Sequence, residues 1–267
     1  MRQQAPFAFG ANWKMFLDRI TPARIQNAQR SLTDFLQLEN LCGKTFLDVG
    51  CGSGLFSLAA FKLGAERIVS FDPDPLSVEC CRTLRARAGE PANWQVHQAS
   101  ILDGEFASWP GTFDIVYAWG TLQHTGRMWE SLKRSSELVG PGGFLYIAVY
   151  NFVDGWLGSR FWLGVKRFYN LLPRAGQRAV EACAIAGYLL LRWLGSLGPR
   201  PDFARYESER GMHWRTDLTD WLGGLPYECA TVEQVFKFVT AKCNGFELYN
   251  LKTTNTLSNN WYLFKKR

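Results

Sequence analysis

The segment FLDVGCGSGLFSLAA, residues 46–60, places three glycines between two apolar runs. The first run, KTFLDVG, predicts a buried β-strand with an acid, Asp48, near its end. The second run has helical spacing and predicts a helix that stops at Gly64. Glycine adopts backbone angles closed to other residues and lets a ligand approach the main chain. Gly50, Gly52 and Gly54 therefore predict a ligand-binding turn at the carboxyl edge of a parallel sheet.

Strand and helix patterns alternate from this turn to Asn151. Further strands are expected in ERIVSFDPD, NWQVHQA, FDIVYAWG and FLYIAVYN, with helices in PLSVECCRTLRARAG and MWESLKRSSELVGPGG. This order predicts a parallel sheet with right-handed crossovers. After a helix in 231–245, the last two strand candidates, FELYNLK and NNWYLFKKR, are joined only by TTNTLS. That link is too short for a parallel crossover, so the pair is expected to be antiparallel.

Four pieces in this order resemble the class I S-adenosylmethionine-dependent methyltransferases: LDVGCGSG, FDPD, FDIVYAWGTLQHTG and LVGPGGFLYIAVYN. The resemblance implies an α/β fold with a Rossmann-like seven-stranded sheet, mostly parallel with an antiparallel C-terminal hairpin. N-terminal helices precede the sheet, and a helical insertion follows strand five. The expected divisions are an N-terminal arm or lid (1–42), a cofactor-binding core (43–151), a substrate cap (152–230) and the final helix and hairpin of the core (231–267).

The same resemblance implies S-adenosylmethionine as the cofactor. Asp48 would hold its ammonium group, and Asp72 would accept hydrogen bonds from both ribose hydroxyls. Asp72 follows Gly54 by 18 residues, near the spacing of the acidic position in nucleotide-binding folds. The alternatives are a turn without a ligand and an aspartate that caps the next helix, a role open equally to Asp74. The other expected cofactor contacts are Gly50, Cys51, Gly52, Gly54, Pro73, Ser100, Ile101 and Trp119.

The expected catalytic residues are His124, Tyr150 and His213. Methyl transfer is an in-line displacement, so the enzyme mainly aligns the nucleophile, and a base matters only for a protonated one. His124 is a candidate base because imidazole titrates near neutrality; packing or helix capping is the alternative. Tyr150 would orient a substrate, and His213 lies in a stretch expected to close the site. His213 and Asp217 share a helix face, but two candidates without a third predict no metal site.

Three roles are open for the apolar part of the insertion: it is buried in a substrate cap, it forms a dimer contact, or it lies on a membrane surface. Residues 152–200 hold seven basic and two acidic side chains, most of the net charge of +6. Within them ACAIAGYLLL is too short to cross a bilayer, which takes about 20 apolar residues. Basic residues beside apolar helices suit an anionic lipid surface or an acidic substrate; a solvated outer face is the alternative. Phe161, Val165 and Phe168 predict a helix with one apolar face.

We therefore expect a methyltransferase for a small-molecule or lipid-like acceptor. The alternatives are displacement at the aminopropyl carbon, which releases methylthioadenosine, and a non-catalytic binding protein of the same fold. Dispersed basic residues and the lack of an NPPY-type tetrapeptide after strand four argue against nucleic acid. Seven cysteines without metal or disulfide spacing, and no export pattern at the N-terminus, favour the cytoplasm, with contact to the inner face of the membrane left open. The oligomeric state, including a homodimer, is also left open.

Overall fold

The computed structural model describes residues 10, 13, 17, 20–103, 111–193 and 214–267. Seven strands form one sheet in the order β3-β2-β1-β4-β5-β7-β6. The strands β1 to β5 pair in parallel, and β7 runs antiparallel to both of its neighbours. The expected mostly parallel sheet with an antiparallel C-terminal hairpin is confirmed. The strands are β1 (Thr45–Val49), β2 (Arg67–Asp72), β3 (Trp94–Gln98), β4 (Phe113–Trp119), β5 (Val139–Tyr150), β6 (Phe246–Lys252) and β7 (Asn259–Lys266).

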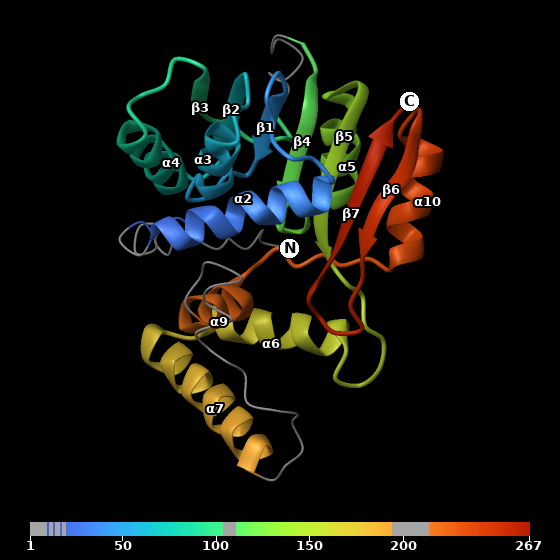
Figure 1. Cartoon of the computed structure of the whole chain (residues 1–267). Coiled ribbons are helices and arrows are strands. Elements are labelled where there is room, and N and C mark those ends of the chain that lie inside the picture. Colours follow the sequence, from blue (N-terminus) through green and yellow to red (C-terminus); the bar gives the residue numbers. More distant parts are fainter. Residues whose placement is uncertain (1–9, 11–12, 14–16, 18–19, 104–110, 194–213) are drawn as a thin grey trace.

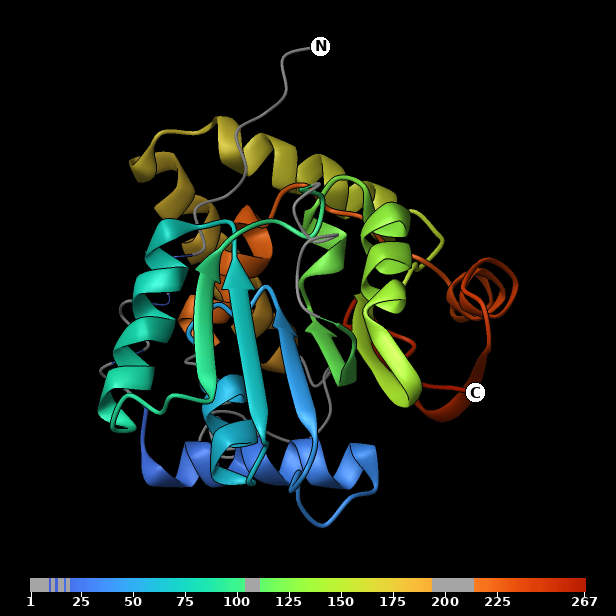
Figure 2. The same ribbon diagram turned by 90° about the horizontal axis from the view of Figure 1, so that it is seen from above.

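Helices cover both faces of the sheet. The first face carries α2 (Pro22–Leu36), α3 (Leu55–Lys62) and α4 (Pro75–Arg87), and the second carries α5 (Met128–Glu137) and α10 (Val232–Lys242). Figure 2 shows α2 on one side of the sheet, away from α5 and α10. The short 3-10 helix η2 (Leu122–His124) follows β4. Within the described part of the insertion, the helices α6 (Ser159–Leu171), α7 (Arg174–Trp193) and α9 (Trp214–Gly223) lie beyond the carboxyl ends of the parallel strands (Figure 1).

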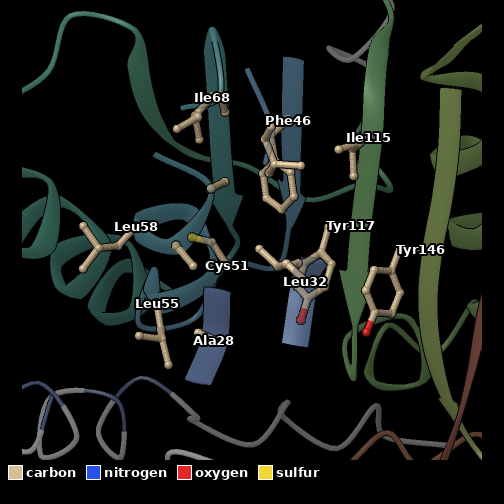
Figure 3. Close-up of a cluster of buried hydrophobic side chains, with 14 of the residues drawn as sticks. Ala28, Leu32, Phe46, Cys51, Leu55, Leu58, Ile68, Ile115, Tyr117 and Tyr146 are labelled. Carbon is tan, nitrogen blue, oxygen red and sulfur yellow. The ribbon is translucent and has the colours of Figure 1, made fainter. Parts of the chain in front are cut away.

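Two apolar cores hold these layers together. Successive residues of β1 point to opposite faces, so Phe46 joins the core under α2 and α3, whereas Leu47 joins the core under α5 and α10. This double burial explains why the strand reads as a continuous apolar run. Figure 3 shows the first core, in which Leu32 of α2 lies beside Tyr117, and the Tyr117 ring in turn stands edge-on to Tyr146 with centroids 5.0 Å apart. Burial of a leucine of this kind contributes about 1.5–3 kcal/mol.

Helix starts follow their sequence signals. Thr21 caps α2 by accepting a hydrogen bond from the Arg24 N–H, with Pro22 in the first turn, as expected. Asp74 caps α4 in the same way, which confirms its capping role. Thr231 and Gln234 form a reciprocal capping box at α10. These local caps fix where the chain leaves each loop.

The insertion is held to itself by polar contacts. The Tyr169 hydroxyl of α6 donates to the Glu181 carboxylate of α7 at 2.6 Å, and the same oxygen accepts from Thr219 of α9 at 3.3 Å. The apolar face expected on α6 points outward, since Phe161 and Phe168 are 44% and 58% exposed. No helix within the described ranges has the length and hydropathy needed to cross a bilayer.

Candidate active site

The turn between β1 and α3 has the backbone that its glycines predict. Gly50, Gly52 and Gly54 have φ angles of 70°, 51° and 81°, in the left-handed region where glycine is favoured. The N–H groups of Gly50 and Cys51 donate to the Phe71 carbonyl at 2.9 and 3.0 Å. The turn is thereby fixed to β2 at the carboxyl edge of the sheet.

Two of the glycines are also required by packing within the protein. A Cβ on Gly50 would lie 2.2 Å from the Thr121 side chain, and a Cβ on Gly54 would lie 2.7 Å from Cys81 Sγ. The Cys51 thiol is hydrogen-bonded to the Cys81 thiol, and this hydrogen bond together with burial holds the pKa of Cys51 well above its usual range. Cys51 is therefore a neutral thiol that links the turn to α4. Its contact with a cofactor stays a prediction.

Asp72 lies at the end of β2, directly beside this turn. Its Oδ2 accepts a hydrogen bond from the Gly52 N–H at 3.0 Å, and its Oδ1 accepts one from the Asp74 N–H at 2.9 Å. Burial raises the pKa of the Asp72 carboxyl to about 6, although these two hydrogen bonds act to lower it. Pro73, which follows, is exposed, and its carbonyl accepts from Gln98 at 3.4 Å.

Asp48 is buried at the end of β1 in a chain of polar side chains. Its carboxylate accepts a hydrogen bond from the Ser57 hydroxyl at 2.5 Å. The Ser57 oxygen lies 2.7 Å from that of Ser70, which accepts from the Trp94 indole N–H at 2.8 Å. Burial, and to a smaller extent the charge of Asp72, raise the pKa of Asp48 to about 7. The ionised form of this carboxyl is thus disfavoured in the protein alone.

These two acids fit S-adenosylmethionine. Asp48 and Asp72 are both buried and repel one another, so a positively charged group between or beside them would stabilise their ionised forms. The cofactor supplies an ammonium and a sulfonium, and it carries a ribose whose hydroxyls a carboxylate accepts. Asp48, Asp72 and the N–H groups of the glycine turn are the residues that would hold it, and it would supply the methyl group.

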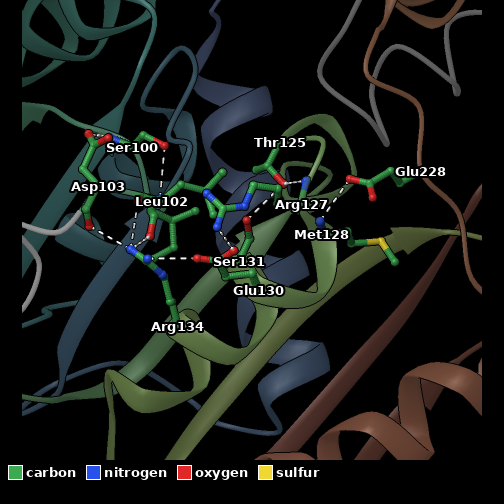
Figure 4. Close-up of polar contacts among 11 residues, drawn as sticks. Ser100, Leu102, Asp103, Thr125, Arg127, Met128, Glu130, Ser131, Arg134 and Glu228 are labelled. Carbon is green, nitrogen blue, oxygen red and sulfur yellow. Dashed lines mark hydrogen bonds and ion pairs between the residues drawn. The ribbon is translucent and has the colours of Figure 1, made fainter. Parts of the chain in front are cut away.

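The loop after β3 is fixed by α5 (Figure 4). Arg134 donates to the carbonyls of Leu102 and Asp103 at 2.8 and 2.9 Å. Within the loop the Ser100 N–H donates to the Asp103 carboxylate at 2.8 Å, and the Ser100 hydroxyl accepts from Leu102 N–H at 3.2 Å. Ile101 is 3% exposed and belongs to the core under α5. The adenine contacts expected from Ser100 and Ile101 stay predictions.

The end of β4 lies against the glycine turn. The Thr121 hydroxyl is 3.4 Å from the carbonyls of Gly50 and Trp119, to which it donates. The Trp119 ring packs edge-on against Trp261 of β7, with centroids 5.7 Å apart. Trp119 therefore takes part in the core, and its contact with the cofactor stays a prediction.

His124 lies in η2, three residues beyond Thr121. Its Nδ1 is 2.8 Å from the Pro226 carbonyl oxygen. A carbonyl only accepts, so Nδ1 carries the hydrogen and Nε2 of the neutral ring carries the lone pair. Burial, aided by the charge of Lys166, lowers the pKa of His124 to about 4. The ring stands edge-on to Tyr150, with centroids 5.5 Å apart, so these two expected residues meet at the same edge.

Known proteins share this sequence pattern. Residues 47–147 match a family model described as a methyltransferase domain. The ubiquinone biosynthesis O-methyltransferase of Methylocella silvestris is 27% identical over 198 residues, which cover 64% of this chain and 73% of that protein. Alignments to two further proteins of that name cover 62% and 59% of their own length. The ribosomal protein L11 methyltransferase of Pseudomonas paraeruginosa is 45% identical over 116 residues, 43% of this chain and 36% of that protein.

Solved structures share the fold. An O-methyltransferase family protein from Burkholderia thailandensis aligns with a TM-score of 0.57 and 15% identity, over 100% of this chain and 65% of that one. The magnesium protoporphyrin IX methyltransferase of Synechocystis PCC 6803, with bound SAH, aligns with a TM-score of 0.52 and 14% identity, over 92% and 84%. Residues 47–147 of this chain thus match a methyltransferase domain, and the chain has the fold of the class I S-adenosylmethionine-dependent methyltransferases. The expected fold, enzyme class and cofactor are confirmed, and no relative named here favours displacement at the aminopropyl carbon.

The methyltransferase places a lysine near His124 that the sequence did not single out. Lys166 of α6 is 0% exposed, although its charge suggested an outer face. Its ammonium lies 4.4 Å from the ring centre of Trp221 and 4.8 Å from that of Tyr227. Tyr227 in turn packs on Tyr150 at 5.2 Å. Only the spacing of α6 could have signalled this, because its buried side is marked by Ser159, Lys166 and Tyr169.

The N-terminal arm of the methyltransferase touches the glycine turn. A Cβ on Gly52 would lie 2.8 Å from the Trp13 ring, so the indole lies directly on this glycine. The Gly10 N–H donates to the Asp74 carboxylate at 2.9 Å. The backbone of Leu17 accepts from Arg87 at 3.2 Å. These contacts support the lid expected from residues 1–42, which stays a proposal.

Two expectations have no outcome here. His213 lies outside the described residues, and its catalytic role stays a prediction. Within the described ranges, no group of three histidine, cysteine or acidic side chains is arranged to hold a metal ion.

Proposed function

We propose that this methyltransferase transfers the methyl group of S-adenosylmethionine to a small-molecule or lipid-like acceptor bound under α6 and α9. The observation that carries the proposal is the meeting of two sets of residues at one sheet edge. Asp48 and Asp72 flank the glycine turn, and His124 and Tyr150 stand at the ends of β4 and β5. Thr121 joins the two sets through its bond to Gly50.

The proposed roles follow from the chemistry of each group. Asp48 would pair with the cofactor ammonium, and Asp72 would accept from the ribose hydroxyls, which fixes the methyl carbon for in-line attack. Tyr150 would orient the acceptor. His124 Nε2 would take the proton of an acceptor that arrives protonated, since its tautomer is set by Pro226. Because the pKa of His124 is about 4, its ring is neutral before the step at physiological pH, becomes an imidazolium when it takes the proton, and then releases that proton to solvent.

The aromatic side chains near His124 support a small acceptor. Aromatic rings from β5, α6 and α9 lie between this edge and the insertion, and small-molecule sites are lined predominantly by apolar and aromatic side chains. Relatives named ubiquinone biosynthesis O-methyltransferases agree with a small acceptor, whereas the ribosomal protein methyltransferases match over a smaller share of the chain. The lining rings are Tyr150, Trp162, Trp221 and Tyr227.

The reaction is tested with S-adenosylmethionine that carries a deuterated methyl group. The purified protein is incubated with this cofactor and a metabolite and lipid extract, and the products are followed by mass spectrometry. We expect S-adenosylhomocysteine together with a small molecule that has gained the labelled methyl group. Release of methylthioadenosine would instead assign the reaction to the aminopropyl carbon. Labelling of ribosomal protein alone would remove the small-molecule acceptor.

We further propose that the insertion contacts the inner face of the membrane. Between residues 156 and 193 eight large apolar side chains are exposed, with Trp156 and Trp193 at 85% and 82%. Exposed arginines share this segment and suit anionic headgroups. The apolar side chains are Trp156, Leu157, Phe161, Phe168, Leu171, Leu189, Leu190 and Trp193. The arginines are Arg160, Arg167, Arg174 and Arg178.

Vesicle sedimentation tests this contact. We expect binding to vesicles that contain phosphatidylglycerol, weaker binding to phosphatidylcholine alone, and a loss of binding in the double variant Trp156→Ser, Trp193→Ser. Phe236→Ser is the matched control, since Phe236 is 41% exposed on α10, away from the insertion. Equal sedimentation of the double variant and the unaltered protein would contradict the proposal.

A further inference from the structure

Lys166 is a buried ammonium with no hydrogen-bond partner among the residues that the structure describes. The residue is 0% exposed. The backbone at Lys166 is tied to the end of α9, because the Asn170 amide donates to the Lys166 carbonyl at 2.8 Å and to the Gly223 carbonyl at 2.9 Å. The position of the lysine is therefore fixed by α6 and the end of α9.

The energetics of this site are unfavourable in the protein alone. Burial of an unpaired ammonium costs several kcal/mol, whereas a cation–π contact returns about 0.5–2 kcal/mol. Lys166 makes two such contacts, with Trp221 and Tyr227. Burial still lowers the pKa of Lys166 to about 7, so the charged form is destabilised. A methionine of similar length would fill the same space without this cost, and stability alone does not explain a lysine here.

The ammonium also lies beside the proposed acceptor site. The Tyr227 ring contacts both the Lys166 ammonium and the Tyr150 ring, at 4.8 and 5.2 Å. Tyr150 contacts His124, and the charge of Lys166 acts on the pKa of His124. Lys166 thus stands on the side of His124 and Tyr150 that faces the insertion, within an enclosure of aromatic rings.

We propose that Lys166 binds an anionic oxygen group, a carboxylate or a phenolate, of an aromatic acceptor. The ammonium supplies the positive charge and three N–H donors, and the rings of Trp221 and Tyr227 supply flat apolar walls. This proposal rests on the proposed function and deepens it, because it names the class of acceptor. An acceptor of this class would pair the buried charge and remove its cost.

The test is calorimetric binding in the presence of S-adenosylhomocysteine, with three probes of similar size. The probes are 4-nitrobenzoate, 4-nitrophenolate and the neutral 4-nitrobenzyl alcohol. We expect the protein to bind at least one anion about tenfold or more tightly than the alcohol, the range of a hydrogen bond to a charged group. The preferred anion identifies the oxygen group. Lys166→Met should remove this preference and leave binding of the alcohol unchanged.

Two controls separate the causes. Lys62→Met removes an exposed lysine of α3 and should bind the probes as the unaltered protein does. Binding of S-adenosylhomocysteine reports on the proposed function alone, because Lys166 is assigned no part in it. A second readout needs no variant: bound 4-nitrophenol should absorb as the phenolate at a pH where the free probe is largely protonated.

The outcomes are distinct. If neither anion binds more tightly than the alcohol, or if Lys166→Met keeps the preference, the proposal for Lys166 is wrong while cofactor binding stands. Failure of the unaltered protein to bind S-adenosylhomocysteine would overturn the proposed function itself.

Discussion

The N–H of Gly52 donates to Asp72 Oδ2 at 3.0 Å, which joins the middle glycine of the turn to the acid that ends β2. The second oxygen of Asp72 accepts from the Asp74 N–H at 2.9 Å. A carboxylate has about four acceptor positions, so these two bonds orient the group and leave capacity for a ligand. Asp72 is thus held in place before the cofactor arrives.

Asp72→Ala should weaken binding of S-adenosylhomocysteine by about tenfold to a hundredfold, since hydrogen bonds to a charged group contribute about 1.5–3 kcal/mol. The variant also leaves two N–H groups unpaired, so its thermal unfolding is measured first, and calorimetry is done where it is fully folded. Asp34→Ala, on the exposed side of α2, is the control. Unchanged affinity in Asp72→Ala would remove the ribose assignment.

Cofactor binding should release a proton near neutral pH. Because the pKa of Asp48 is about 7 in the protein alone, this carboxyl is partly protonated there. A cofactor ammonium beside it favours the ionised form and lowers that pKa. Affinity should therefore rise with pH up to about 7 and level off above it.

Calorimetry in two buffers of different ionisation enthalpy checks this release. We expect proton release at about pH 6.5 and almost none at about pH 8.5, where Asp48 is already ionised. Asp48→Asn cannot titrate and should show a smaller release at this pH and a smaller rise in affinity, since only Asp72, with a pKa of about 6, still contributes. An identical proton count in Asp48→Asn would assign the effect to another group.

Gly54→Ala should destabilise the fold more than Gly89→Ala. Both glycines have positive φ, 81° and 88°, and an alanine there costs about 1–2 kcal/mol. Only at Gly54 would the new Cβ meet other atoms, with Cys81 Sγ at 2.7 Å and Cys81 Cα at 2.9 Å, whereas space around Gly89 is open. Overpacking adds about 1–3 kcal/mol. Urea unfolding measures the difference; equal losses would show that α4 moves aside freely.

Lys166 should make stability depend on pH above neutrality. Its pKa is about 7 in the folded protein and 10.5 in an unperturbed lysine. Between these values the unfolded chain binds more protons, so the free energy of unfolding should rise with pH. Lys166→Met should unfold at a higher temperature at pH 7 and lose this rise. A lower unfolding temperature for Lys166→Met would mean that the ammonium is paired in solution.

Most of the sheet was predictable because its signals are local. The apolar runs, the glycine turn and the short link before β7 each act within a few residues, and they gave the strands, the cofactor turn and the antiparallel hairpin. The loop after β3 is different: its backbone is held by Arg134, a residue of a later helix. Whether Ser100 and Ile101 face a purine or the core depends on that distant contact.

The acceptor side of the site was harder to predict. Lys166 has the charge of a surface residue, and it becomes buried only because Trp221 and Tyr227 return to cover it. Conversely, Phe161 and Phe168 have the pattern of a core face but point outward. In both cases the burial of α6 depends on residues far along the chain, and the spacing of Ser159, Lys166 and Tyr169 alone does not say that this polar side is the one that is covered.

The indole of Trp13 lies on Gly52 and so links the proposed cofactor turn to the start of the chain. A molecule that contacts this glycine from the side of its missing Cβ would meet the Trp13 ring, so the lid proposed for residues 1–42 would have to move its indole when the cofactor binds there. Each catalytic cycle exchanges a spent cofactor for a fresh one. The Trp13 ring would therefore have to move once in each cycle if the cofactor contacts Gly52.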